Sequence, residues 1–160
     1  MSKTVKTNAM RKLETLGIAY EIRTYPVDEE HLDGVHVAQA VGLDPAMVFK
    51  TLVLEAEDRS HLVCVIPVEK ELDMKAVARA TGHKSVAMLK LTDLLPLTGY
   101  IRGGCSPIGM KKTFPTWIDS ACLAQESIAV SAGLRGMQML LPPQDLIRAI
   151  GAKTAELCRA

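Results

Sequence analysis

The segment Thr98–Lys112, with the sequence TGYIRGGCSPIGMKK, constrains this chain more than any other. It holds four glycines and one proline in fifteen residues, which no helix or strand interior needs, so it predicts a loop. Glycine lets a backbone approach a ligand closely, and successive free N–H groups can surround an oxygen atom. This composition fits a tight surface turn as well as a substrate-binding loop. The common nucleotide loops are absent, because the chain has no G-x-x-x-x-G-K-[ST] and no G-x-G-x-x-G that opens a helix.

Short helical and strand patterns alternate irregularly around this loop. Apolar spacing and caps predict helices over 7–16, 35–41, 73–80 and 143–150, with shorter ones after Asp44 and after Thr92, the latter ending before Pro96. Alternation and apolar runs predict strands over 18–24, 50–55, 61–68, 84–88, 116–119, 127–131 and 138–141. Without regular βαβ alternation, these elements predict an α+β fold. The length of 160 residues, with no repeat or linker, predicts a single domain over 1–160.

Composition limits the classes of function. Hydrophobic residues make up 48% of the chain and aromatic residues only 4%, so we expect an ordered domain with an aliphatic core. No apolar run approaches ~20 residues, and Met1–Lys6 lacks the apolar part of a signal peptide, so we expect a cytoplasmic protein. The four cysteines form no C-x-x-C pair, which disfavours a zinc site and predicts reduced thiols. A net charge of +1 predicts that any contact with RNA is local and weak.

The residues Gly103-Gly104-Cys105-Ser106-Pro107-Ile108-Gly109 are similar to the Gly-Gly-x-Ser-Pro-x-Gly loop of the YbaK family. These proteins are free-standing relatives of the editing domain inserted in bacterial prolyl-tRNA synthetases. The resemblance continues in Thr24-Tyr25, in Phe49-Lys50-Thr51-Leu52-Val53 and in Val130–Gly136, in the family's order. It implies a curved mixed sheet or partial β-barrel surrounded by helices. It also implies a trans-editing deacylase for Cys-tRNA(Pro), with Cys-tRNA(Cys) as a second candidate substrate, that needs no cofactor. The implied partners are aminoacyl-tRNA and prolyl-tRNA synthetase, with no DNA and no membrane.

The resemblance also assigns roles to residues that would otherwise be ordinary. Alone, Lys50 is a lysine at a strand end, but in the family this lysine is the catalytic residue, whose ammonium can stabilise negative charge. Thr51 follows it and, in a strand, faces the opposite side. Gln138 stands where an aspartate is usual, which removes a charge from amino-group recognition. The implied substrate-binding residues are Tyr25, Thr51, Gly103, Gly104, Ser106, Ser131 and Gln138.

No protein nucleophile stands out in the sequence. Ser131 has no Ser-His-acid arrangement around it, and the four histidines show no triad or metal spacing. Cys105 would be a good nucleophile as a thiolate, but it lacks a base partner and its position varies within the family. The resemblance implies instead that the thiol of the substrate attacks its own ester. Two alternatives stay open: a deacylase for Ala-tRNA(Pro) or another small aminoacyl-tRNA that uses water, and a non-catalytic module that binds aminoacyl-tRNA or a synthetase.

Basic residues give a limited prediction for tRNA. Lys111, Lys112 and Arg135, together with Lys75 and Arg79, would form a small basic patch if the fold brought them together. Such a patch would contact the end of an acceptor stem and little more. We therefore expect weak tRNA contact through Lys111, Lys112 and Arg135.

Overall fold

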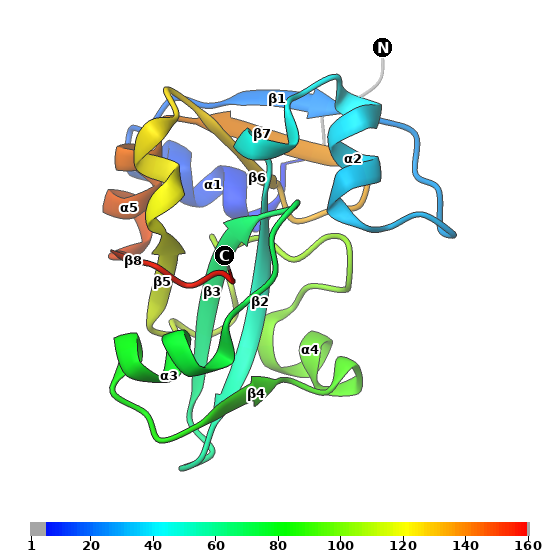
Figure 1. Ribbon diagram of the computed structural model, residues 1–160. Helices are drawn as coiled ribbons and strands as arrows, with labels where there is room; N and C mark the ends of the chain where they lie inside the picture. The colour runs from blue at the N-terminus through cyan, green and yellow to red at the C-terminus, as the bar shows by residue number, and fades with distance from the viewer. Residues whose placement is uncertain (1–5, 160) are drawn as a thin grey trace.

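The strands form two sheets, one of three strands and one of five (Figure 1). The computed structural model describes residues 6–159. Its helices are α1 (Asn8–Thr15), α2 (Gly34–Val41), α3 (Met74–Thr81), α4 (Leu91–Thr98) and α5 (Pro143–Ile150), with short 3₁₀ helices η1 (Pro45–Met47) and η2 (Ser120–Ala124). Its strands are β1 (Glu21–Thr24), β2 (Phe49–Ala56), β3 (His61–Pro67), β4 (Val86–Met88), β5 (Thr116–Asp119), β6 (Ile128–Ser131), β7 (Met137–Leu141) and β8 (Lys153–Ala155).

The first sheet has the order β1-β7-β6 and is antiparallel. The second has the order β4-β2-β3-β5-β8, with antiparallel pairing at β4-β2-β3 and parallel pairing at β3-β5-β8. A single parallel bridge between Val48 and Ala129 joins the start of β2 to β6. The sheets thus continue into each other without closing, with helices outside them (Figure 1). The expected α+β fold with a partial barrel is confirmed.

Local capping explains most helix boundaries. Asp33 and Asp73 accept hydrogen bonds from backbone N–H groups at the starts of α2 and α3. Gly42 and Gly82 end the same helices in the left-handed conformation, where glycine carries no steric cost. Asp44 caps η1, as its Asp-Pro sequence predicts. These signals depend on neighbouring residues only, which is why the sequence predicts them well.

Two apolar clusters use opposite faces of the β2–β3 hairpin. The larger cluster includes Val53 and Val65, together with residues of α1, β6, β7 and α5. The smaller one includes Leu54, Ile66 and, from α3, Val77. Because both faces of β3 are covered, all its residues from Leu62 to Pro67 are buried, which explains its continuous apolar run.

Two elements differ from the prediction. Helix α4 passes through Pro96 to Thr98, where it was expected to end before the proline. The carbonyl of Thr92 loses its partner at Pro96, but Thr92 is exposed to solvent, and the Thr98 hydroxyl strengthens the last turn by donating to the Leu94 carbonyl at 2.8 Å. Strand β8 was not predicted, because Lys153-Thr154-Ala155 has no apolar alternation and forms only by pairing with β5.

None of the described helices has the length and apolar character needed to cross a membrane. The expectation that Met1–Lys6 is not a signal peptide concerns a segment of which residues 1–5 lie outside the described range.

Candidate functional site

A cavity of about 500 Å³ lies along one edge of β2. Its walls come from segment 32–37, from residues 48–53, from the segment that includes the start of α4, from the glycine-rich loop, and from β6 and β7. The polar side chains in these walls include Asp33, Lys50, Thr51, Ser131 and Gln138. The cavity therefore brings together Lys50, Thr51, Gly103, Ser131 and Gln138, five of the residues that the sequence proposed.

The cavity exists because β2 lacks a neighbour along part of its edge. Val48 is bridged to Ala129 at one end of this stretch, and Leu54 pairs with Met88 at the other. Even-numbered positions such as Val48 and Ala56 exchange hydrogen bonds with the β3 side, since Val68 N–H donates to Val48 O and Ala56 N–H to Ser60 O. In an antiparallel ladder the alternate peptide groups point the other way. The backbone N–H and C=O of Thr51 therefore face the cavity.

Lys50 and Thr51 point to opposite faces of β2, as strand alternation predicts. The odd-numbered Phe49 and Val53 belong to the larger cluster, whereas Leu52 and Leu54 face the smaller one. Both Lys50 and Thr51 still line the cavity, because it runs along the strand edge rather than over one face. Among residues 6–159, no ion pair or side-chain hydrogen bond engages the Lys50 ammonium. This cation is available to a ligand.

Two polar atoms in the cavity wall are buried without a partner. Among the described residues, Thr51 Oγ1 and Gln138 Oε1 have no hydrogen-bonding group within reach. Gln138 is only 5% exposed and lies in register with Ser131 on β6. A buried polar group without a partner costs stability, so each of these atoms needs a partner that the described side chains do not supply, either a water molecule or a ligand.

The glycine-rich loop is held rigidly from inside. The Tyr100 hydroxyl donates to the Ile108 carbonyl at 2.7 Å, and burial raises the pKa of Tyr100 to about 12, so it stays a donor. Ser106 is fully buried, and its Oγ accepts the Ile108 N–H at 3.2 Å. Ser106 does not line the cavity, so in this structure it shapes the loop.

The loop packs tightly against the turn that follows β6. A Cβ atom on Gly104 would lie 3.0 Å from the backbone nitrogen of Arg135 and 3.2 Å from the carbonyl carbon of Leu134. Arg135 Nε donates to the Arg102 carbonyl at 2.8 Å across the same contact. Gly104 itself is buried beneath the cavity surface, whereas Gly103 reaches it. The two family motifs are thus side by side.

Cys105 lines the cavity but is not an ionised thiol. Burial raises the pKa of this cysteine from 9.0 to about 12. At neutral pH the side chain is a protonated thiol, which is a poor nucleophile. This agrees with the sequence argument against Cys105 as the attacking group.

A second, smaller cavity of about 140 Å³ adjoins the first and shares Leu32, Val37 and Gly103 with it. Tyr25 and Arg135 lie here rather than in the main cavity. His31 and His36 also line it, although sequence reasoning dismissed the histidines. The overlooked signal was a repeated Asp-x-x-His pattern, Asp28 to His31 and Asp33 to His36.

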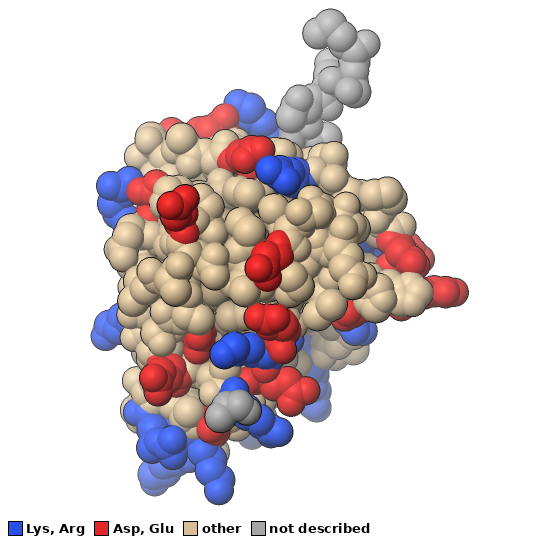
Figure 2. Space-filling model, turned by 45° about the horizontal axis from the view of Figure 1, so that its top comes forward, with Lys and Arg blue, Asp and Glu red and all other residues tan. Residues whose placement is uncertain are grey.

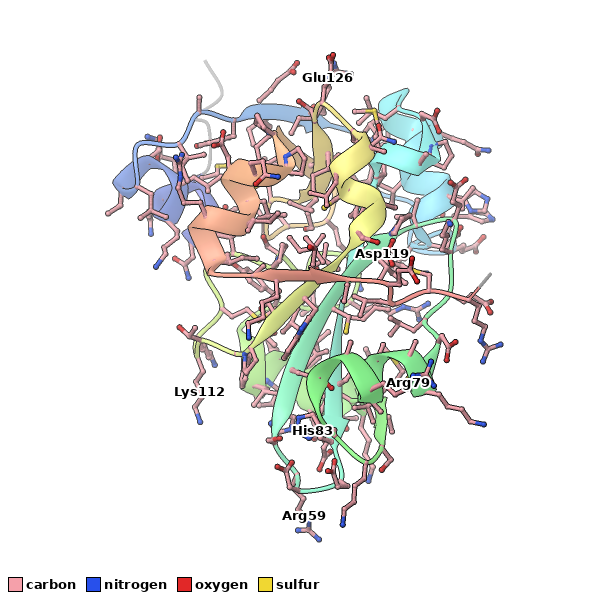
Figure 3. The ribbon with its side chains drawn as sticks, turned by 60° about the vertical axis from the view of Figure 1, so that its left-hand side comes forward. Arg59, Arg79, His83, Lys112, Asp119 and Glu126 are labelled. Atoms are coloured by element: carbon pink, nitrogen blue, oxygen red, sulfur yellow. The ribbon has the colours of Figure 1, made fainter. Side chains whose placement is uncertain are left out.

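The basic residues do not gather into one patch. Lys111 and Lys112 are exposed and line neither cavity, and Figure 3 shows Lys112 and Arg79 on opposite sides of the molecule. On the face in Figure 2, lysine and arginine gather at the lower edge, while acidic side chains are scattered above. The fold therefore does not bring these basic residues together into the single patch that the sequence analysis considered.

One group of side chains in the described range has the composition of a metal site. Glu57, Asp58 and His83 have ligand atoms within 4.8 Å of one another. They lie around the β2–β3 turn, at the far end of the molecule from the first sheet, where Figure 3 labels His83 and Arg59. None of the three lines the main cavity.

Comparison with known proteins now gives the family. Residues 30–149 match the aminoacyl-tRNA editing domain. A protein of Enterococcus faecalis, provisionally named a Cys-tRNA(Pro)/Cys-tRNA(Cys) deacylase, is 45% identical over 95% of this chain and 93% of its own length.

Solved structures agree in fold. A protein described provisionally as a trans-editing enzyme for prolyl-tRNA synthetase superposes with a TM-score of 0.84 at 23% identity, covering 98% of this chain and all of the other. The crystal structure of a hypothetical protein, APE2540, gives a TM-score of 0.87 at 19% identity, covering 96% of this chain and all of the other. With the match over residues 30–149 and the close relative, these findings show that the chain belongs to the aminoacyl-tRNA editing domain family.

Proposed function

We propose that this protein is a trans-editing deacylase that removes cysteine from Cys-tRNA(Pro), with Cys-tRNA(Cys) as a second substrate. The observation that carries the proposal is the 500 Å³ cavity. It joins an open strand edge to a lysine and two polar atoms that have no partner among residues 6–159. The activity named for the 45% identical relative supports the same substrate class. tRNAs are charged in the cytoplasm, so we propose that the protein works there.

In the proposed reaction the substrate supplies its own nucleophile. The cysteine sulfur attacks the ester carbonyl carbon, a C–S bond forms, and the C–O bond to the ribose breaks. The thiol proton ends on the leaving ribose oxygen, and water then opens the resulting thiolactone to free cysteine. The Lys50 ammonium stabilises negative charge on oxygen during the attack. Positioning supplies much of the rest, since well-oriented intramolecular reactions gain about 7–11 kcal/mol.

This mechanism suits a cavity whose own thiol is not ionised. Cys105 is the cysteine in the cavity wall, and burial raises its pKa to about 12. Selectivity then follows from reactivity as well as from size, because a bound alanyl ester has no thiol with which to attack. That matters because pocket size alone separates side chains that differ by one small group only about 10–200-fold.

We also propose that prolyl-tRNA synthetase provides tRNA selection. The net charge of +1 and the separation of Lys112 from Arg79 support weak binding of tRNA by this protein alone. A bound synthetase would hold tRNA(Pro) and deliver its 3′ end to the cavity.

The test is ester loss from labelled Cys-tRNA(Pro) and Ala-tRNA(Pro) mixed with the pure protein. We expect rapid loss of cysteine and little loss of alanine. Faster loss of alanine would replace the proposal with a deacylase that uses water. No loss from either substrate, with binding retained, would make the protein a non-catalytic module.

A further inference from the structure

The small cavity beside the main one has the dimensions of a subsite. Its volume of about 140 Å³ is well below the ~300–1,000 Å³ of cavities that hold a complete small ligand. It shares walls with the main cavity at Leu32, Val37 and Gly103. A ligand whose ester lies near Lys50 would therefore extend one further ring system into it.

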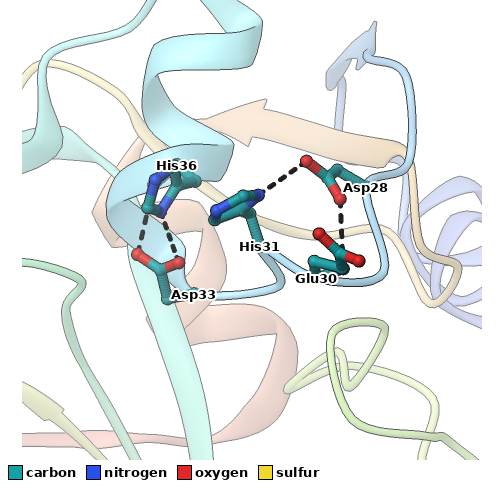
Figure 4. Close-up of polar contacts among 5 residues, drawn as sticks. All are labelled: Asp28, Glu30, His31, Asp33 and His36. Atoms are coloured by element: carbon teal, nitrogen blue, oxygen red, sulfur yellow. Dashed lines mark hydrogen bonds and ion pairs between the residues drawn. The ribbon is translucent and has the colours of Figure 1, made fainter.

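Two histidines in its wall are each paired with a carboxylate. His31 Nδ1 lies 2.7 Å from Asp28 Oδ2, and His36 Nδ1 contacts Asp33 Oδ1. Their rings lie next to each other at a tilt of 37°, with centroids 4.5 Å apart (Figure 4). A carboxylate only accepts hydrogen bonds, so in the neutral imidazoles Nδ1 carries the proton and Nε2 is left as an acceptor.

The charge around the histidines excludes one kind of ligand. Segment 28–33 carries Asp28, Glu29, Glu30 and Asp33. The hydrogen bond from His31 lowers the pKa of Asp28. At Asp33 burial is the largest influence and raises the pKa, but the side-chain and backbone hydrogen bonds and the charge of His36 together outweigh it, so the pKa of Asp33 is also lowered. Both carboxylates stay ionised, and the Nε of the cavity's arginine, Arg135, is engaged by the Arg102 carbonyl. The negative charge of these carboxylates disfavours a phosphate in the small cavity. A neutral ring that carries a hydrogen-bond donor is compatible with it.

The remaining wall residues suit a flat ring. Tyr25 and Arg135 offer an aromatic plane and a guanidinium plane, and Pro26, Val27 and Ala40 add apolar surface. Nucleobases at unpaired RNA ends are bound by stacking on such planes and by hydrogen bonds to their edges.

We propose that, given the deacylase function above, the small cavity binds the adenine that ends every tRNA. The Nε2 atoms of His31 and His36 are the acceptors for its exocyclic amino group. A base with a carbonyl at that position, such as guanine or hypoxanthine, would set an acceptor against these acceptors and be rejected. The two Asp–His pairs act as positioning elements, because each carboxylate fixes which imidazole nitrogen accepts.

The test compares Cys-tRNA(Pro) with the same RNA ending in purine riboside, which lacks the amino group. It is run at about pH 8, because only a neutral imidazole has an Nε2 atom that accepts a hydrogen bond. We expect the wild type to favour the adenine-ended RNA by about 3–10-fold in kcat/KM, the value of one hydrogen bond. His31→Phe and His36→Phe keep a planar ring but remove Nε2, so they should lower kcat/KM only for the adenine-ended RNA. His61→Phe is the matched control, because His61 packs against Phe114 and lines neither cavity.

Equal kcat/KM on both RNAs in the wild type, or equal losses on both in the two variants, would overturn the proposal. A second measurement does not depend on activity: the imidazole signals of His31 and His36 in NMR spectra should shift with adenosine and not with inosine. Shifted signals without deacylation would remove the proposed function and keep the base site. Deacylation without discrimination, and without these shifts, would remove the base site alone.

Discussion

Within the part of the chain that the structure describes, Thr51 Oγ1 and Gln138 Oε1 are unpartnered polar atoms in the cavity wall. We therefore expect Thr51→Val and Gln138→Leu to stabilise the fold and to lower the deacylation activity. A buried polar group without a partner costs about 1–3 kcal/mol, and replacing it with an apolar group of similar shape recovers part of that. We expect each variant to gain about 1 kcal/mol in the free energy of unfolding, a rise in Tm of about 2–4 °C for a chain of this size. Deacylation should fall by about 10–100-fold in kcat/KM, since a hydrogen bond to a charged group of the substrate is lost.

Thr98→Val is the matched control for this prediction. Thr98 is also buried, but its Oγ1 has partners: it donates to the Leu94 carbonyl at 2.8 Å and accepts the Tyr100 N–H at 3.0 Å. The same substitution should therefore lower the free energy of unfolding by about 1–3 kcal/mol. Urea unfolding and single-turnover deacylation measure the two effects. If Thr51→Val destabilises as much as Thr98→Val and deacylates normally, the reasoning from unpartnered atoms is wrong.

Four further predictions concern the same site. Lys50→Ala should lower kcat/KM by about 10²–10³-fold with Tm nearly unchanged, and Lys50→Arg should not restore activity because a guanidinium is larger and planar; near-normal turnover would contradict the role of Lys50. Cys105→Ala should deacylate normally in single-turnover assays, and its failure as a folded protein would revive the protein nucleophile. Gly104→Val should lower the free energy of unfolding by about 1–3 kcal/mol in urea, because its Cβ would lie 3.0 Å from the backbone of Arg135. An unchanged unfolding midpoint would mean that the two loops move apart to accommodate the side chain. Uncharged tRNA(Pro) should bind weakly and salt-sensitively without the synthetase; tight, selective binding by this protein alone would reveal a recognition surface that the net charge of +1 conceals.

Local chemistry made much of the fold predictable. Asp33, Asp73 and Gly42 act on the residues next to them, so the sequence predicts the helix boundaries that they control. The hairpin of β2 and β3 follows from two apolar strands around a polar turn. Strand β8 escaped prediction because its pairing with β5 involves residues more than thirty positions away.

The candidate site divides in the same way. Lys50 and Gln138 were proposed from motifs, and the fold brings both to one cavity. Ser106 was proposed from the same kind of motif, yet its hydroxyl is used inside the loop, which only the three-dimensional contact with Ile108 reveals. His31 and His36 were missed because their relevance depends on a cavity assembled from distant segments, including Tyr25 and Arg135. Motif spacing alone does not show which distant residues share a cavity. It does so only where a resemblance to a known family already places those residues in one site.

The unpaired edge of β2 also has a consequence for self-association. An open strand edge normally invites a strand from another molecule, which begins aggregation. Here the free stretch is bracketed by the Val48–Ala129 bridge at one end and by β4 at the other. A foreign strand would have to displace one of them to run alongside β2, whereas the proposed small ester substrate would need to displace neither. The protein can therefore keep these backbone groups unpaired in the crowded cell without offering them to its own copies.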